Sequence, residues 1–221
     1  MKGLKYILVY LLVVIILPSC KEEEEPFNYG DFYYDMVTYV GDNSGKSVFT
    51  FQSYNDSPLI TLTASNVSKP GMVKGQRLLL NYIVNEEQGD NNKVVEVKGY
   101  SKVTTDTIQV LSQEELGALK CDEVKIKSVW RTGNYLNVRC MVEYTKEPRR
   151  LFLASTGLPD ENGMIQTYQI QDLMGAQTFY WFETYLSYYI APVWDDEATT
   201  GIRYNVVDLS YPEVKYYDFL K

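Results

Sequence analysis

Three consecutive carboxylates follow a tryptophan in the last part of the chain, at Asp195, Asp196 and Glu197. Carboxylate oxygens on a loop can hold Ca²⁺ when carbonyl groups and waters complete the coordination shell. The spacing matches no complete calcium-binding loop such as the EF-hand pattern. We therefore interpret these residues as a solvated acidic loop and predict no metal site.

Catalytic chemistry is narrowed by the absence of histidine from the sequence. The absence of histidine excludes Ser-His-Asp and Cys-His nucleophilic sites and every histidine-ligated metal site. Two carboxylates about 5 to 10 Å apart could still hydrolyse a glycoside, but the 29 acidic residues offer no spacing that singles out a pair. The sequence predicts that the protein is not an enzyme and needs no cofactor.

Aromatic side chains are dense between residues 179 and 194. Flat amphipathic rings suit protein interfaces and sugar faces, because they bury a large area and keep a polar end. Strands also favour aromatic residues for packing, so core positions are the competing interpretation. The candidate contacts are Trp181, Tyr185, Tyr188 and Trp194. We expect these side chains to contact a protein partner. The alternative is that they contact a sugar and that the protein is a surface glycan-binding module or weak glycosidase.

The first residues have the layout of a secretory signal, with Lys2 and Lys5 before an uncharged apolar run. That run, Tyr6–Leu17, is shorter than the roughly 20 residues that a spanning helix needs. It closes on Leu-Pro-Ser-Cys, which resembles a bacterial lipobox ending at Cys20. We predict that residues 1–19 are removed and that the Cys20 thiol takes a lipid anchor. The alternative is an ordinary signal peptide with an incidental cysteine.

A lysine and four acidic residues stand directly after Cys20: Lys21, Glu22, Glu23, Glu24 and Glu25. This run resembles the lipoprotein export signal of Bacteroidetes, which marks proteins displayed on the outer-membrane surface. We predict that residues 20–31 form a lipidated acidic tether, because like charges repel and stay extended. The competing interpretation of the acidic run is that it serves only as this solvated tether and is not an export signal. We predict a lipid-anchored outer-membrane protein that faces outward, with a periplasm-facing anchor as the alternative.

The charge balance limits the partners of the mature chain. Cleavage before Cys20 would leave 19 basic against 29 acidic side chains, a balance of about −10. This argues against nucleic acid or another anionic surface as a partner.

Two further cysteines, Cys121 and Cys140, could pair in an oxidising compartment. The segments Val124–Trp130 and Tyr135–Tyr144 are predicted to form a hairpin that places Cys140 opposite Lys125. The two cysteines would then lie roughly 13 Å apart along the strands, beyond the reach of a disulfide. We predict two free thiols, both largely buried.

Residues 32–111 contain short alternating runs separated by turn signals, which is typical of a small β-barrel. The predicted strands are Phe32–Val40, Ser47–Tyr54, Leu59–Thr63, Leu78–Val84, Val94–Lys102 and Thr107–Leu111.

A short helix is predicted over Ser112–Lys120, because Ser112 and Glu115 form a capping box. It is expected to link the barrel to a second half at 112–221. There the alternation of Tyr135–Tyr144 and regular strand spacing predict an antiparallel β-sandwich. For Phe179–Ile190 both a strand and a helical stripe fit, and we favour a strand because Pro192, Asp195 and Asp196 indicate a loop after it.

The lipobox and the two predicted β-halves together resemble the NigD-like lipoproteins of Bacteroidetes. The matching residues are Gly75, Gln76, Arg77, Leu78, Leu79, Leu80, Asn81 and Tyr82 in the first half, and Val124–Trp130, Tyr135, Leu136, Asn137 and Val138 in the second. The resemblance implies an OB-type barrel followed by a β-sandwich, and it carries no catalytic residues. The family's association with bacteriocin gene clusters suggests immunity or envelope defence through an unknown protein partner.

Overall fold

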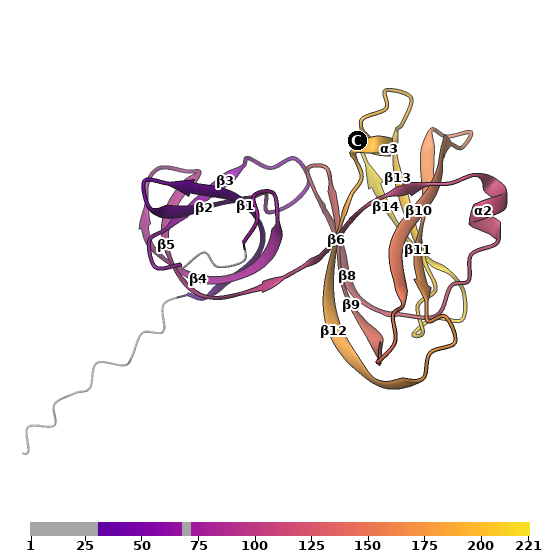
Figure 1. The fold of residues 1–221 in the computed structure, drawn as a ribbon. Coiled ribbons are helices and arrows are strands. Elements are labelled where there is room, and N and C mark those ends of the chain that lie inside the picture. Colours follow the sequence, from indigo (N-terminus) through magenta and orange to yellow (C-terminus); the bar gives the residue numbers. More distant parts are fainter. Residues whose placement is uncertain (1–30, 68–71) are drawn as a thin grey trace, which may run out of the picture. The chain divides into compact units, whose positions relative to one another are not determined.

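The computed structural model describes residues 31–67 and 72–221, and Asp31–Lys221 forms one compact unit. The signal segment 1–19, Cys20 and the run Lys21–Glu25 lie outside the described residues. The described chain consists of strands and two short helices, which confirms the all-β prediction (Figure 1). No helix in this part of the chain is long and apolar enough to cross a membrane.

Five strands close into a barrel in the order β1-β2-β3-β5-β4, the arrangement of a small OB-type barrel. Alternate residues point inward, and side chains such as Phe49, Leu62 and Leu80 have no exposed surface. β1 curves at a bulge between Tyr39 and Gly41, where a φ of 127° suits glycine. The strands are β1 (Tyr33–Asn43), β2 (Lys46–Phe51), β3 (Ile60–Ala64), β4 (Arg77–Glu87) and β5 (Asn92–Lys102).

The predicted strand Thr107–Leu111 does not belong to the barrel. β6 (Thr104–Thr107) pairs with β12 (Thr178–Tyr189), and β7 (Gln109–Val110) pairs with β10 (Arg150–Pro159). The chain therefore enters the second half directly after β5 and contributes one short edge strand to each of its two sheets.

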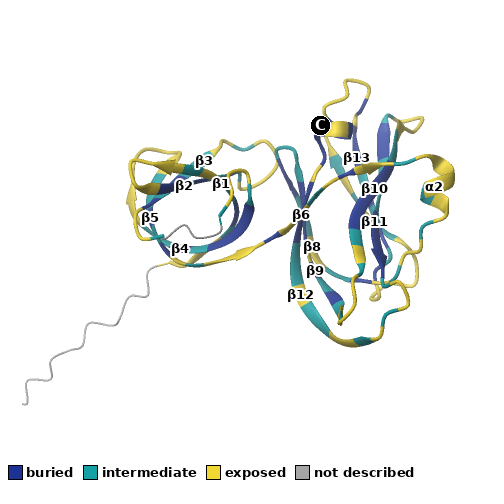
Figure 2. Ribbon diagram, viewed as in Figure 1, coloured by how far each residue is buried: buried dark blue, intermediate teal, exposed yellow. Residues whose placement is uncertain are grey.

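The second half is a sandwich of two sheets, with the orders β14-β13-β11-β10-β7 and β6-β12-β9-β8. Its buried core is formed by the facing sides of both sheets (Figure 2). The pairs β7–β10, β6–β12 and β11–β13 are parallel, so the sheets are mixed rather than purely antiparallel as we predicted. The remaining strands are β8 (Lys125–Thr132), β9 (Tyr135–Thr145), β11 (Met164–Asp172), β13 (Gly201–Val206) and β14 (Lys215–Leu220).

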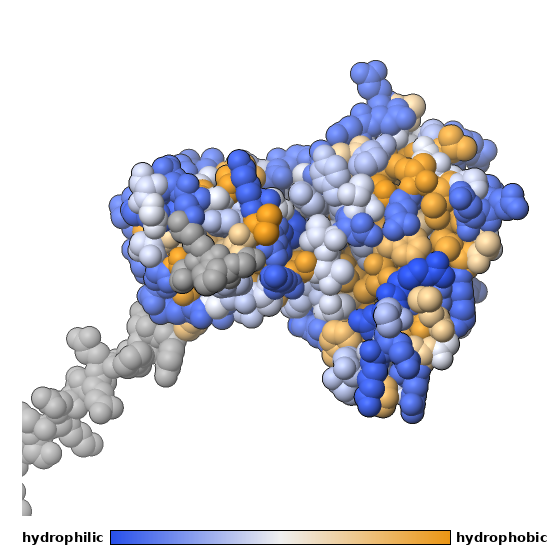
Figure 3. Space-filling model, in the orientation of Figure 1, coloured by the Kyte–Doolittle hydropathy of each residue, from blue (hydrophilic) through white to orange (hydrophobic). Residues whose placement is uncertain are grey.

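The capping box at Ser112 is confirmed, and α2 (Gln113–Gly117) follows it. The Glu115 amide donates to Ser112 Oγ at 3.2 Å, and the Ser112 amide donates to the Glu115 carboxylate at 2.9 Å. Because β7 precedes α2, the helix does not join barrel to sandwich. Instead Leu116 and Leu119 pack against β10 and β11, next to a face of the sandwich where hydrophobic residues gather (Figure 3).

Residues 179–189 lie in strand β12, which confirms the choice of strand over helix, and Ile190 follows the strand as the N-cap of the next helix. The segment after it differs from our prediction of a loop. A single helical turn, α3 (Ala191–Trp194), follows, and Pro192 stands in its first turn, where proline is tolerated.

The β8–β9 hairpin exists, but its register differs from the predicted one. The strands run on to Thr132 and Tyr135, so the turn contains only Gly133 and Asn134. With a bulge next to Ile126, Cys140 lies opposite Ile126 instead of Lys125. Cys140 is buried and Cys121 is exposed, so the expectation of two buried thiols was wrong for Cys121.

Candidate functional site

A groove of about 1060 Å³ lies where the barrel meets the outer face of the four-stranded sheet. Along β9 the side chains of Val138 and Cys140 enter the sandwich core, so Arg139 between them points away from it and into the groove. The barrel supplies the opposite wall from β1, from the end of β2 and from β4 and β5. Both halves of the molecule are therefore needed to form the groove.

The sheet side of the groove carries a charged and aromatic trio. Arg139 Nη2 and Glu183 Oε2 are 2.9 Å apart, and the Tyr185 hydroxyl donates to Glu183 Oε1 at 3.2 Å. The guanidinium of Arg139 also lies 5.8 Å from the centre of the Tyr185 ring. Arg139 and Tyr185 are directly opposite in the β9–β12 register, which explains this contact. Hydrogen bonding and charge from Arg139 lower the pKa of Glu183, so the pair is ionised at neutral pH.

The barrel side presents three consecutive residues of β1. Tyr34 is 61% exposed, whereas Met36 is buried against the partly buried rings of Trp130 and Tyr185. Between them Asp35 accepts a hydrogen bond of 2.8 Å from the Tyr82 hydroxyl. Partial burial raises the pKa of Asp35 despite that hydrogen bond. The wall thus combines an exposed ring with a desolvated carboxyl group.

Arg77 holds the barrel to the sandwich beside this groove. Only 3% exposed, it donates to Ser187 Oγ at 3.1 Å, to Asn137 Oδ1 at 3.0 Å and to Thr38 Oγ1 at 3.1 Å. Its guanidinium lies 4.5 Å from the centre of the Tyr135 ring. Burial lowers the pKa of Arg77 to about 10, so it remains a cation at neutral pH.

A second arginine, Arg131 on β8, fixes a further contact between the halves. It forms an ion pair with Asp56, and its Nη1 donates to the carbonyl of Gly133 at 2.7 Å. The backbone adds two bonds, from Asn55 N to Arg131 O and from Gly133 N to Asn55 O, both 2.7 Å long. These contacts hold the segment after β2 against the end of β8, so the walls of the groove are anchored.

The four candidate aromatic residues do not form one site. Tyr188 and Trp194 belong to the sandwich core and are not available as ligand contacts, which corrects our expectation for both. Trp181 is partly buried, with Lys125 Nζ 4.0 Å from its ring centre. Only Tyr185 lines the groove.

A separate exposed aromatic group lies at the start of β12. Tyr144 and Tyr180 stack with ring centres 4.9 Å apart and planes within 11°, and Phe179 lies 6.2 Å from Tyr144. Lys146 Nζ lies 5.0 Å from the Phe179 ring centre. Tyr180 is 57% exposed, so this group offers ring surface to solvent.

The acidic loop has local structural roles. Asp195 Oδ2 accepts from Asn134 Nδ2 at 3.3 Å, and Asp196 Oδ1 accepts from the Ala198 amide at 2.9 Å. Glu197 is exposed. Among the described residues, no group of three or more His, Cys, Asp or Glu side chains is placed to hold a metal ion.

Several groove residues were not singled out from the sequence, above all Tyr34, Trp130 and Arg139. The alternation of β9 does identify Arg139 as an outward residue. No local signal indicates that the barrel covers that face, because the contact joins segments about 100 residues apart in the chain.

Solved structures of Bacteroidales proteins share this fold. A protein of unknown function, DUF1344, from Bacteroides vulgatus superposes with a TM-score of 0.70 at 19% identity, covering 86% of this chain and 91% of that one. A Bacteroides fragilis protein provisionally described as a lipoprotein gives 0.61 at 11% identity, over 86% and 98% of the two chains. A NigD-like immunity protein from Bacteroides caccae gives 0.57 at 15% identity, over 87% and 98%.

The sequence itself matches no family model and no curated protein. At these low identities the structural similarity establishes the fold shared with the NigD-like protein.

Proposed function

We propose that this protein is a non-catalytic lipoprotein, anchored through Cys20 and displayed on the outer-membrane surface, that binds a protein partner in the groove between its two halves. The observation that carries the proposal is the groove itself, with exposed Tyr34 facing the Arg139, Glu183 and Tyr185 trio.

Three properties of the groove suit a protein partner. Aromatic and arginine side chains supply most of the binding energy at protein interfaces, and Tyr34, Tyr185 and Arg139 are of these types. The Arg77 and Arg131 contacts hold both walls in place, which reduces the entropy lost on binding. The volume is also large enough for several side chains of a partner.

Immunity against an antagonistic peptide toxin is the biological role that we propose for this binding. It is supported by the fold shared with a NigD-like immunity protein and by the run after Cys20 that resembles an export signal. A toxin captured at the cell surface is prevented from reaching its target.

The immunity role is tested in a deletion strain challenged with toxins from neighbouring competitors. We expect the deletion to increase sensitivity to at least one toxin and the wild-type gene to restore resistance. Tyr34→Ala and Arg139→Glu should fail to restore it, because they remove an exposed ring and reverse a groove charge. The matched controls Tyr211→Ala and Lys146→Glu change comparable exposed residues outside the groove and should restore it. A deletion strain as resistant as its parent to every competitor would contradict the role.

Anchoring and display are tested separately. Cys20→Ala should leave a chain that no longer incorporates labelled fatty acid and is released from membranes. Replacing Glu22 to Glu25 with glutamine should keep the lipid but protect the chain from protease added to whole cells, because the export address is lost. If the wild-type chain resists such protease while a known surface protein is cleaved, outward display is wrong.

Glycan capture is the second candidate, and the stacked pair Tyr144 and Tyr180 favours it. Stacked, exposed rings beside Lys146 offer the flat surface on which sugar rings pack. A glycan array should then show binding that Tyr144→Ala or Tyr180→Ala abolishes. Silence across the array, or binding unchanged by both substitutions, removes this candidate.

A further inference from the structure

The open edges of the two sandwich sheets are not equally protected against pairing with another strand. Among the described strands the edges are β14 and β7 in one sheet and β6 and β8 in the other. β6 has four residues and β7 only two, and short strands offer little to pair with. β8 carries a bulge between Ile126 and Ser128, and Asn55 covers its end. β14 has none of these protections.

β14 is a regular six-residue strand. It pairs with β13 without a register shift, from Val206 opposite Lys215 to Gly201 opposite Leu220. The Lys221 amide donates to Thr200 O at 3.0 Å, which continues the ladder by one residue. In an antiparallel ladder, residues alternate between bonding toward the neighbour and away from it. The backbone N–H and C=O groups of Tyr216, Asp218 and Leu220 therefore point toward the open edge.

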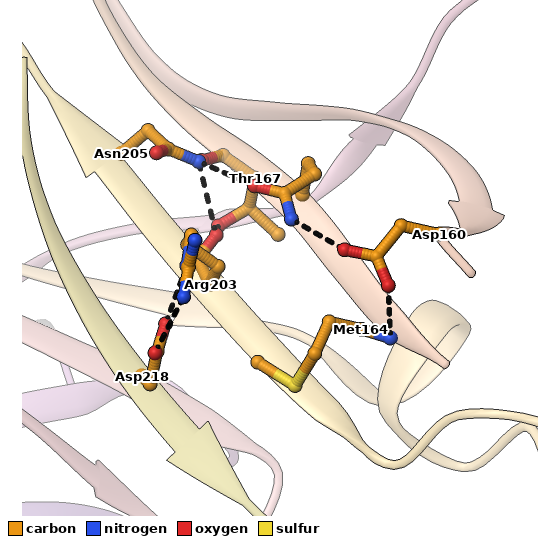
Figure 4. A network of polar contacts seen from close by, with 7 residues as sticks. Asp160, Met164, Thr167, Arg203, Asn205 and Asp218 are labelled. Atoms are coloured by element: carbon orange, nitrogen blue, oxygen red, sulfur yellow. Dashed lines mark hydrogen bonds and ion pairs between the residues drawn. The ribbon is translucent and has the colours of Figure 1, made fainter. Parts of the chain in front are cut away.

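The charges that normally protect an edge are engaged within the same chain here. Arg203 binds Asp218 with two bonds of 2.7 and 2.8 Å, as Figure 4 shows. Lys215 Nζ lies 4.0 Å from the Tyr211 ring centre and 5.0 Å from that of Tyr217. Lys221 Nζ donates to the carbonyl of Asp196 at 2.6 Å. An approaching strand thus meets backbone groups and the exposed side chains of Tyr216 and Leu220 rather than unpaired charges.

We infer that β14 pairs antiparallel with β14 of a second copy of this chain, which joins the two five-stranded sheets into one continuous sheet. A two-fold axis perpendicular to the sheet keeps the exposed side chains of both copies on one face. This inference does not depend on the proposed function of the groove.

The register of this pairing follows from the residues that face the edge. Only residues whose backbone groups point outward can exchange hydrogen bonds, which leaves Tyr216, Asp218 and Leu220 to pair with one another. A register centred on Asp218 places two carboxylates opposite each other, which is unfavourable. Shifting it by one pair places Tyr216 opposite Asp218 of the second copy. Within each chain the centre of the Tyr216 ring lies 4.1 Å from the Arg203 guanidinium, and that guanidinium binds Asp218. In this register the Arg203 and Asp218 side chains of the two copies come together with opposite charges alternating.

One strand pair buries less than the roughly 1,200 Å² of a stable specific interface. The dimer is therefore weak and reversible, and covalent trapping suits it better than chromatography. The full-length chain is expressed in cells as two differently tagged copies, with the photo-crosslinking residue p-benzoylphenylalanine in place of Tyr216. We expect irradiation to join the two tags in one band of twice the chain's mass.

The variant Asp218→Pro, with the crosslinker retained at 216, removes the outward N–H but no backbone hydrogen bond to β13, and proline is tolerated on sheet edges. It also removes the ion pair with Arg203, which Asp218→Ala removes as well. We expect it to reduce the crosslinked band at least tenfold. Asp218→Ala removes the carboxylate but keeps the N–H, and should retain most of the band. Protection of Cys140 from thiol reagents shows that each variant is folded. A band containing only one tag, or an unchanged band in the folded proline variant, overturns the inference, as does crosslinking to a different protein alone.

Discussion

Arg77 at the start of β4 and Asn137 in β9 are joined across the two halves by a hydrogen bond of 3.0 Å between Nη2 and Oδ1. The same Asn137 oxygen accepts from the Ser187 hydroxyl at 2.9 Å, and its Nδ2 donates to Thr132 Oγ1 at 2.9 Å. This buried cation is held by neutral oxygens, and none of its hydrogen-bond partners among the described residues is a carboxylate. The barrel and the sandwich are therefore joined by a polar network in which each member depends on the others.

Arg77→Ala should lower the free energy of unfolding by about 2 to 4 kcal/mol, because it leaves a cavity and buried polar atoms with fewer partners. Urea denaturation of the unlipidated mature chain measures this. Arg150→Ala is the control, since its ion pair with Asp172 leaves Arg150 largely exposed and should matter by less than about 1 kcal/mol. Equal effects of the two substitutions would show that the junction does not stabilise the fold.

Asp35→Asn should raise the melting temperature at pH 7. Burial raises the pKa of Asp35 above its ordinary value of 3.8, so the folded chain favours the protonated carboxyl. The protonated carboxyl of Asp35 therefore makes its full contribution to stability below pH 3.8. This contribution is lost as the pH rises through the pKa that Asp35 has in the folded chain. Asparagine stays neutral and can still accept the hydrogen bond from Tyr82.

The difference between Asp35→Asn and wild type should accordingly vanish at pH 3. Asp90→Asn, in an exposed turn, should leave the melting temperature unchanged at both values. A variant less stable than wild type at pH 7 would mean that the charged carboxylate stabilises the fold.

Thiol reagents should distinguish the two cysteines of a Cys20→Ala chain. Cys121 is exposed and should react in the folded state. Partial burial of its sulfur, with Asp122 and Asp172 nearby, raises its pKa, so the rate should increase as the pH rises above 7. Burial raises the pKa of Cys140 to about 12, and its thiol should react only after unfolding. Two thiols that react at one rate in the folded chain would contradict this placement.

Leu186→Ala should destabilise the protein by about 2 to 5 kcal/mol, because Leu186 is fully buried in the sandwich core and its removal leaves a cavity. Leu158 provides the matched control, since it is 72% exposed and its replacement by alanine should change stability by less than about 0.5 kcal/mol. Thermal and urea unfolding compare the two variants.

Local sequence signals were sufficient for most of the elements, but not for α3, whose segment we expected to be a loop. Alternation predicted the barrel strands and β9, and the Ser112 and Glu115 pair located α2, since these features depend on residues within a few positions of one another. The Cys20 motif and the acidic run after it are likewise properties of the sequence alone, and the anchoring inferred from them stays a prediction.

Partners distant in the chain decided the rest. Thr104–Thr107 joins β12 rather than the barrel, and nothing within the segment specifies that choice. Tyr185 and Tyr188 are three residues apart in one strand, so they point to opposite faces, but only the packed sheets show that one face is core and the other is groove. Side-chain type predicts that a residue can be buried or can bind. Which of the two it does depends on the surface brought against it, and that surface comes from residues far away in the sequence.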